Sequence, residues 1–257
     1  MTPEVTLGLP TSALVNEEFT FPLTFDNGGD PGDVGYGPYA ELIVPPAGSE
    51  TQQVEILGAT YQGAQLPVTA VTFDQNGNAK HPLLEDSNGQ PLIVTGPPGG
   101  TLFVFPLPFG SYAPEQPPTG LEVQARMVGN TAAALGTQVN VTAGGGFYLG
   151  EDPLDDPGPD PPIIADPVTE AISPAVMQID KQYLGPEGET ATGPNFVQTW
   201  RLNINIADGQ TINNLVLSDV LAPSLQFVSA SRVFVHGVPA AASDIVARTT
   251  PPRGSKE

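Results

Sequence analysis

The 257-residue sequence has no cysteine, which excludes disulfides, thiolate metal sites and thiol nucleophiles. Basic residues are also scarce, because 8 Lys and Arg stand against 28 Asp and Glu and the formal net charge is -20. Nucleic acids are held by clustered Lys and Arg that neutralise phosphates, and anionic membrane surfaces attract the same residues. The composition therefore argues against nucleic acid and anionic membranes as partners.

Long hydrophobic runs are missing as well. The sequence contains no stretch of 18 consecutive apolar residues, so we expect no membrane span. The opening residues, MTPEVTLGLP, lack the basic and apolar regions of a signal peptide. If the protein is exported, its export signal is expected to lie outside this segment.

Glycine and proline are abundant, with 29 and 30 residues, so we expect few helices and many turns. Alternation of apolar and polar residues with a period of two predicts strands instead, most clearly over 19–25. Six similar runs follow, each bounded by turn residues: 40–44, 53–61, 68–73, 101–107, 121–128 and 136–143. This number of short strands predicts a β-sandwich domain over 1–148.

An acidic, proline-rich linker is predicted over 149–174. Residues 149–170 contain seven carboxylates, six prolines and no basic residue, a composition that disfavours helix and central strand. Fixed proline φ angles and repelling charges predict a semi-rigid, extended spacer. The alternative is that its N-terminal half lies along the first domain and covers a sheet edge.

Strand-like alternation resumes after this linker. It is strongest over 196–206, where Trp200 shares a face with aliphatic residues and is expected to point inward. Other runs cover 175–185, 211–221, 225–230 and 232–237. Five strands are fewer than the roughly seven of a sandwich, so 175–257 is predicted to be a second, truncated β-sandwich domain. The predicted fold is all-β, with tandem Ig-like antiparallel β-sandwiches joined by the Pro/Asp-rich linker.

The second half resembles a known pattern, the Ig-like conserved repeats of prokaryotic surface proteins of the domain-of-unknown-function-eleven type, most clearly over 180–232. The residues that carry the resemblance are Lys181, the strand from Trp200 to Ile206, Asp219, Leu221, Pro223, Leu225, Phe227, Val228, Ser229 and Ala230. One departure is Asp208-Gly209, where the family usually has Asn-x-Gly. The resemblance implies a β-sandwich spacer or adhesive module in a large exported or envelope protein, with no enzymatic role.

Calcium is the one cofactor that the residues themselves suggest. Asp74, Asn76, Asn78 and Glu85 occupy positions 1, 3, 5 and 12 of a loop spaced like an EF-hand. Against this, Ala79 stands where that loop needs glycine, and an Asn-Gly hairpin turn is the alternative interpretation.

Two further acidic segments have the oxygen density for calcium. One contains Asp26, Asp30 and Asp33, for which ordinary turn chemistry is the alternative. The other spans 151–166, for which a solvated acidic linker is the alternative. The seven residues from Asp26 to Glu85 are the predicted calcium ligands.

Catalysis finds little support in the sequence. His81 and His236 are the only histidines, neither lies in a catalytic motif, and both are expected at the surface. Lys181 raises the idea of an intramolecular isopeptide bond, for which an edge lysine that blocks aggregation is the alternative. We therefore expect no enzymatic activity.

The sequence thus predicts a non-catalytic structural or adhesive module of a large exported bacterial or archaeal surface protein, located outside the cell or in the envelope. Its expected partners are neighbouring repeats of the same chain, with a surface glycan or protein ligand as a further candidate. The alternative is a carbohydrate-binding or accessory module of a secreted enzyme, in which Tyr36, Tyr39 and Tyr112 would stack on sugar rings.

Overall fold

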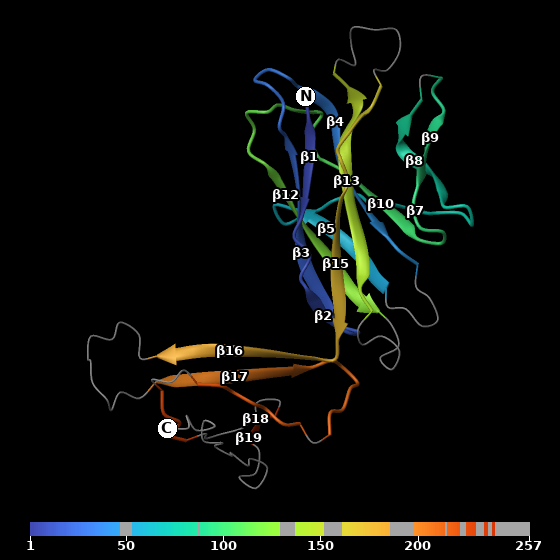
Figure 1. Cartoon of the computed structure of the whole chain (residues 1–257). Coiled ribbons are helices and arrows are strands. Elements are labelled where there is room, and N and C mark those ends of the chain that lie inside the picture. The colour runs from blue at the N-terminus through green and yellow to red at the C-terminus, as the bar shows by residue number, and fades with distance from the viewer. Residues whose placement is uncertain are drawn as a thin grey trace, which may run out of the picture. The chain divides into compact units, whose positions relative to one another are not determined.

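A computed structural model of the chain is all-β, with no helix among the residues that it describes (Figure 1). The described residues are 1–46, 53–86, 88–128, 137–151, 161–185, 198–213, 215–221, 225–229, 234–235 and 238–239. Two large sheets contribute to one apolar core, which confirms the predicted β-sandwich for the N-terminal part of the chain.

The first sheet has five strands in the order β1-β3-β12-β5-β6, and all its pairs are antiparallel. Its strands are β1 (Pro3–Leu7), β3 (Glu18–Asn27), β12 (Thr119–Val128), β5 (Gln53–Tyr61) and β6 (Ala64–Gln65). The runs predicted over 19–25, 53–61 and 121–128 are therefore strands of one sheet.

The second sheet has the order β2-β15-β13-β4-β10-β7, with β11 added to β4 and β14 added to β13. Its strands are β2 (Ser12–Leu14), β15 (Val168–Ala175), β13 (Val139–Gly150), β4 (Gly35–Val44), β10 (Thr101–Pro106), β7 (Thr69–Thr72), β11 (Ser111–Tyr112) and β14 (Ile163–Ile164). Only β2 and β15 pair in parallel among the strand pairs of the described residues.

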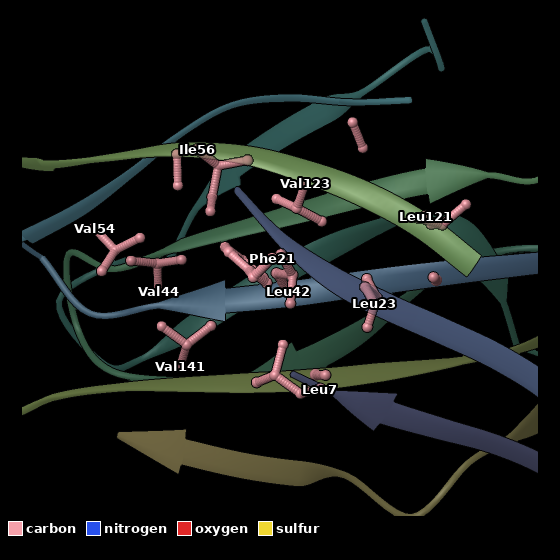
Figure 2. Packing of buried hydrophobic residues seen from close by; sticks show 14 of the residues in the cluster. Leu7, Phe21, Leu23, Leu42, Val44, Val54, Ile56, Leu121, Val123 and Val141 are labelled. Carbon is pink, nitrogen blue, oxygen red and sulfur yellow. The ribbon is translucent and has the colours of Figure 1, made fainter. Parts of the chain in front are cut away.

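The main core lies between these two sheets. Phe21, Leu23 and Phe25 of β3 are buried on one side, and Leu42 and Val44 of β4 are buried on the other (Figure 2). Burying a side chain of this size contributes about 1.5–3 kcal/mol, so alternation alone supplies much of the driving force. On β3 the intervening Pro22 and Thr24 face the other side, as the period of two requires, whereas on β4 the intervening Ile43 packs against a second core.

A smaller core covers the outer face of the second sheet. Strands β8 (Asn78–Glu85) and β9 (Pro91–Thr95) form a hairpin. Buried residues of β8 pack with residues of β4 and β10 and with Phe73, which follows β7. The cluster consists of Tyr39, Phe73, Ala79, Leu84, Leu102 and Val104. Strand β4 is thus buried on both faces, which explains why its sequence is apolar almost throughout.

The predicted linker over 149–174 needs correction in its C-terminal half. Residues 168–175 form β15, which pairs with β13 on one side and with β2 on the other. Pro174 is tolerated because the neighbouring residues supply the hydrogen bonds, with Ser173 N donating to Thr11 O at 3.0 Å and Val15 N donating to Ala175 O at 2.9 Å. The first domain therefore extends beyond residue 148, and residues 152–160 lie outside the described residues.

After β15, the chain forms a two-stranded ribbon of β16 (Met177–Gly185) and β17 (Thr199–Ile206). Contacts divide the chain into Met1–Thr211 and Ile212–Glu257 rather than at the predicted boundaries, because Ala207 after the ribbon is buried in the main core. The second unit contains the short strands β18 (Phe234–Val235) and β19 (Val238–Pro239). The described parts of the predicted strands over 211–221 and 225–230 have no strand partner there and are not strands.

None of the described residues forms a helix that is long and apolar enough to cross a membrane.

Candidate functional site

The predicted calcium ligand Asp26 lies near the end of β3, and Asp30 and Asp33 lie in the connection from β3 to β4. Asp33 Oδ2 accepts a hydrogen bond from the terminal amine of Met1 at 2.9 Å and one from Asp30 N at 3.3 Å. The hydrogen bond and charge of that amine lower the pKa of Asp33. Asp26 Oδ1 accepts from Asn27 N at 2.8 Å. These oxygens therefore stabilise the turn itself.

The predicted loop of Asp74, Asn76, Asn78 and Glu85 is divided by a strand. Asp74 Oδ1 accepts from Asn76 N at 2.8 Å and from Asn78 N at 2.9 Å. Glu85 ends β8, which Asn78 begins, so on the order of 20 Å of strand separates them. The structure does not bring Glu85 together with the other three residues, because β8 is extended rather than looped.

The turn that begins at Asp74 has a second copy just after β8. The segment Asp86-Ser87-Asn88-Gly89-Gln90 repeats the pattern D-x-N-G, and Asp86 Oδ1 accepts from Asn88 N at 2.8 Å and Gln90 N at 2.9 Å. The main chain also closes alike, with Asp74 N donating to Asn78 O and Asp86 N to Gln90 O. Gly77 and Gly89 supply the positive φ angles of 78° and 71°. The repeated motif in the sequence could have identified both turns.

Within the described ranges, no three His, Asp or Glu side chains converge in a way that could hold a metal ion. Calcium binding stays a prediction from the sequence.

A cluster of three ionisable side chains, Tyr39, Glu41 and His81, lies beneath the β8–β9 hairpin. Contrary to the expectation of a surface histidine, His81 is only 2% exposed, because its strand faces the sheet. Its Nε2 lies 2.9 Å from Glu41 Oε2, and its Nδ1 accepts from Leu83 N at 3.1 Å and Leu84 N at 3.0 Å. Because Nδ1 faces two donors, the ring proton belongs on Nε2, which donates to the carboxylate. The side chain of His236 lies outside the described residues.

Tyr39 forms the base of this cluster. Its ring meets the His81 ring edge to face, with centroids 5.3 Å apart, and its hydroxyl has no hydrogen-bond partner among the described residues. Burial raises the pKa of Tyr39, and the Glu41 carboxylate raises it further. Within the cluster, His81 joins the β8–β9 hairpin to β4 through its contact with Glu41, whereas the Tyr39 hydroxyl takes no part in these hydrogen bonds.

The proposed aromatic platform is wrong for two of its three tyrosines. Tyr39 and Tyr112 are buried, whereas Tyr36 is half-buried. The Tyr112 hydroxyl donates to Pro117 O, and its ring packs edge to face on Phe25. Because Tyr39 and Tyr112 are buried, the three tyrosines offer no shared surface to a sugar.

A shallow hollow of about 760 Å³ surrounds Arg126 at one end of the first sheet. Its carboxylates are those of Glu17, Glu18, Glu55 and Asp208. Arg126 forms a hydrogen-bonded ion pair with Glu18 and lies 3.8 Å from Glu55 Oε2. The arginine is engaged by its own neighbours, so the hollow offers no free cation to an anionic ligand.

The ribbon of β16 and β17 has two chemically different faces. One face is apolar apart from Lys181, and its cross-strand pairs are Met177 with Ile206, Ile179 with Ile204, Lys181 with Leu202, and Tyr183 with Trp200. The other face carries the polar residues Gln178, Asp180, Gln182, Arg201, Asn203 and Asn205. The apolar face is partly open, with Ile179 51% and Trp200 43% exposed, so the inward position expected for Trp200 is wrong in this structure.

Lys181 lies with its Nζ 5.0 Å from the centre of the Trp200 ring, a cation–π contact. This contact places the lysine side chain on the apolar face of the ribbon. The isopeptide bond stays an untested idea from the sequence.

Comparisons with known proteins give only distant likenesses. No family model and no curated protein matches the sequence. Among solved structures, AvmM, which catalyses macrocyclization in alchivemycin A biosynthesis, is 12% identical over 67% of this chain and 87% of its own, with a TM-score of 0.38. A cohesin module from a Clostridium perfringens family 33 glycoside hydrolase is 10% identical over 67% and 96%, with a TM-score of 0.29. A C-terminal fragment of the major pilin of Streptococcus agalactiae is 11% identical over 71% and 57%, with a TM-score of 0.32. Likenesses this low assign neither a family nor a function.

Proposed function

We propose that the chain is a non-catalytic structural module of a large exported bacterial or archaeal surface protein, with its residues after β15 starting a second β-sandwich. The observation that carries this proposal is the two-faced ribbon of β16 and β17, one side of which is apolar apart from Lys181. A two-stranded ribbon is at best marginally stable alone, and such a face is normally covered by a second layer.

The segment after the ribbon has the composition of that layer. Residues 215–221 and 225–229 expose apolar side chains, among them Val216, Val220 and Val228, which are 86%, 90% and 75% exposed. A short connection joins this segment to β17, which gives it a high effective concentration at the ribbon. We therefore propose that the chain after β15 belongs to one domain, in keeping with the resemblance to Ig-like repeats of surface proteins.

Charge supports a role as a spacer. Lys80 and Arg126 are the only basic residues in 1–175, so the sandwich is strongly acidic. Like charges keep neighbouring modules soluble and apart in a tandem chain. The partners under this proposal are the adjoining modules, and the location is the cell surface or envelope.

The test compares two adjacent substitutions on opposite faces of β17 in the full chain. Ile204→Asp puts a charge on the apolar face, whereas the matched control Asn205→Asp puts it on the polar face. If the second sandwich forms, Trp200 fluorescence shows a cooperative unfolding transition in urea. Ile204→Asp abolishes that transition, and Asn205→Asp preserves it. Equal, non-cooperative curves for all three proteins would contradict the assignment of a second domain.

Export is tested separately on intact cells of the producing organism. Antibodies raised against the purified chain should label them, and external protease should remove the label. Labelling only after lysis would contradict the surface location.

A further inference from the structure

The N-terminal segment and the last strand of the sandwich run side by side in the same direction. Within the second sheet, β2 and β15 pair in parallel, with Ser12 opposite Ser173 and Leu14 opposite Ala175. Two backbone hydrogen bonds of ordinary length join the segments, at 3.0 Å from Ser173 N to Thr11 O and 2.9 Å from Val15 N to Ala175 O.

This side-by-side course begins well before β2. Leu9 N donates to Glu170 Oε2 at 2.8 Å. Further upstream, Val5 lies against Gly145, whose carbonyl oxygen accepts from Ala165 N at 2.9 Å. Residues 5–15 therefore run alongside residues 165–175, because β1 contacts β15 and β2 pairs with it.

The same N-terminal segment is bound to both sheets. Its first part, β1, pairs with β3 in the first sheet, and its second part, β2, pairs with β15 in the second. At the end of β2, Asn16 N donates to Met127 O at 2.7 Å, and Val15 is buried. Removing the segment therefore means separating it from both halves of the sandwich.

We propose that these contacts make the sandwich a force-bearing module, with the paired segments 5–15 and 165–175 as its mechanical clamp; this rests on the proposed structural function. In a tandem chain, tension enters a module at its two ends. Because the two segments are parallel, those ends lie at opposite ends of the pair. Tension then slides the segments along each other, and the hydrogen bonds across them are loaded together instead of one after another.

The test is single-molecule stretching of the full chain at constant force. With handles at Met1 and Glu257, unfolding of the sandwich is identified by the release of about 600 Å of chain, the extended length of some 175 residues. The chain has no cysteine, so Glu17→Cys offers a unique second attachment point just after β2. Pulling between residue 17 and Glu257 loads the same end of both strands, and the pair should open bond by bond, at least tenfold faster at equal force.

Variants separate the clamp from general stability. Ser173→Pro removes the donor to Thr11 O, and Glu170→Ala removes the acceptor of Leu9 N without changing the strand backbone. When force is applied at the two chain ends, the loss of one such hydrogen bond should raise the unfolding rate about fivefold. Leu92→Ala, in the β8–β9 hairpin outside the clamp, serves as the control and should leave that rate unchanged even where it lowers equilibrium stability.

Equal rates in the two pulling geometries, or equal acceleration by Glu170→Ala and Leu92→Ala, would overturn the clamp. That result would leave a passive spacer, since the urea and cell-labelling tests of the proposed function do not depend on force. Conversely, a failed second domain would leave the clamp measurement valid, because the clamp lies within residues 1–175.

Discussion

Replacing His81 with alanine is predicted to detach the β8–β9 hairpin from the second sheet. The imidazole is buried and engages three partners: Glu41 Oε2 at 2.9 Å, Leu83 N at 3.1 Å and Leu84 N at 3.0 Å. Alanine leaves two main-chain N–H groups and a carboxylate oxygen without these partners. A buried polar group that loses its partner costs about 1–3 kcal/mol.

Summed over these three groups, the upper limit of the loss for His81→Ala is therefore about 3–9 kcal/mol, comparable with the roughly 5–15 kcal/mol that stabilises a domain. Opening of the hairpin limits the loss, because water then solvates the exposed groups. Two controls keep the shape of the cluster. Glu41→Gln retains an acceptor for Nε2–H and should cost about 1 kcal/mol or less. Tyr39→Phe deletes a hydroxyl without a described partner and should leave stability unchanged or higher.

Urea unfolding followed by circular dichroism measures the free energies, and hydrogen exchange at Leu83 and Leu84 reports the hairpin. We expect those two amides to lose protection in His81→Ala but not in either control. A change below about 0.5 kcal/mol in His81→Ala, with both amides still protected, would refute the role of the buried histidine.

Two further predictions concern the acidic turns. Backbone hydrogen bonds from Gln90 and Asn88 lower the pKa of Asp86, so the folded state favours its ionised form. The ionised carboxylate therefore stabilises the turn above the ordinary pKa of 3.8, and this stabilisation is lost as pH falls through the lowered pKa. Asp86→Asn should remove this pH dependence. Hydrogen exchange of the hairpin amides over an acid titration measures it, and identical profiles for the two proteins would contradict the prediction. For calcium, the carboxylates of Asp33 and Asp74 already accept main-chain or terminal-amine hydrogen bonds, so melting midpoints in Ca²⁺ and in EDTA should agree within about one degree. A saturated site would instead add about 2.7 kcal/mol at 100 times its Kd, and a rise of several degrees would bear out the calcium prediction.

The sequence predicted the strands of the sandwich well because alternation with a period of two follows directly from burial of one face. Phe21, Leu23 and Phe25 are an example, since all three are buried between the sheets. The role of the oxygen-rich loops is harder to predict, because closely spaced Asp and Asn residues occur both in hydrogen-bonded turns and in calcium sites. Only the hydrogen bonds of Asp74 and its counterpart Asp86 distinguish the two uses.

The errors arose where tertiary pairing overrides local composition. Residues 168–175 follow an acidic, proline-rich stretch, yet β15 forms because β13 and β2 offer partners on both sides. His81 and Glu41 are 40 residues apart, and no local signal announces their contact. Trp200 alternates like a core residue, but whether it is covered depends on a layer that one strand's sequence does not specify.

The domain boundary and the clamp both require that residues 168–175 form a strand of the sandwich that pairs with the N-terminal segment. Hydrogen exchange of the full chain tests it at two amides, Ser173 N and Val15 N, whose bonds join β15 to the N-terminal segment. We predict that both are protected as strongly as the central amides of β4 and β13. Exchange at the rate of an unstructured linker, with β4 and β13 still protected, would contradict both the clamp and the boundary of the domain.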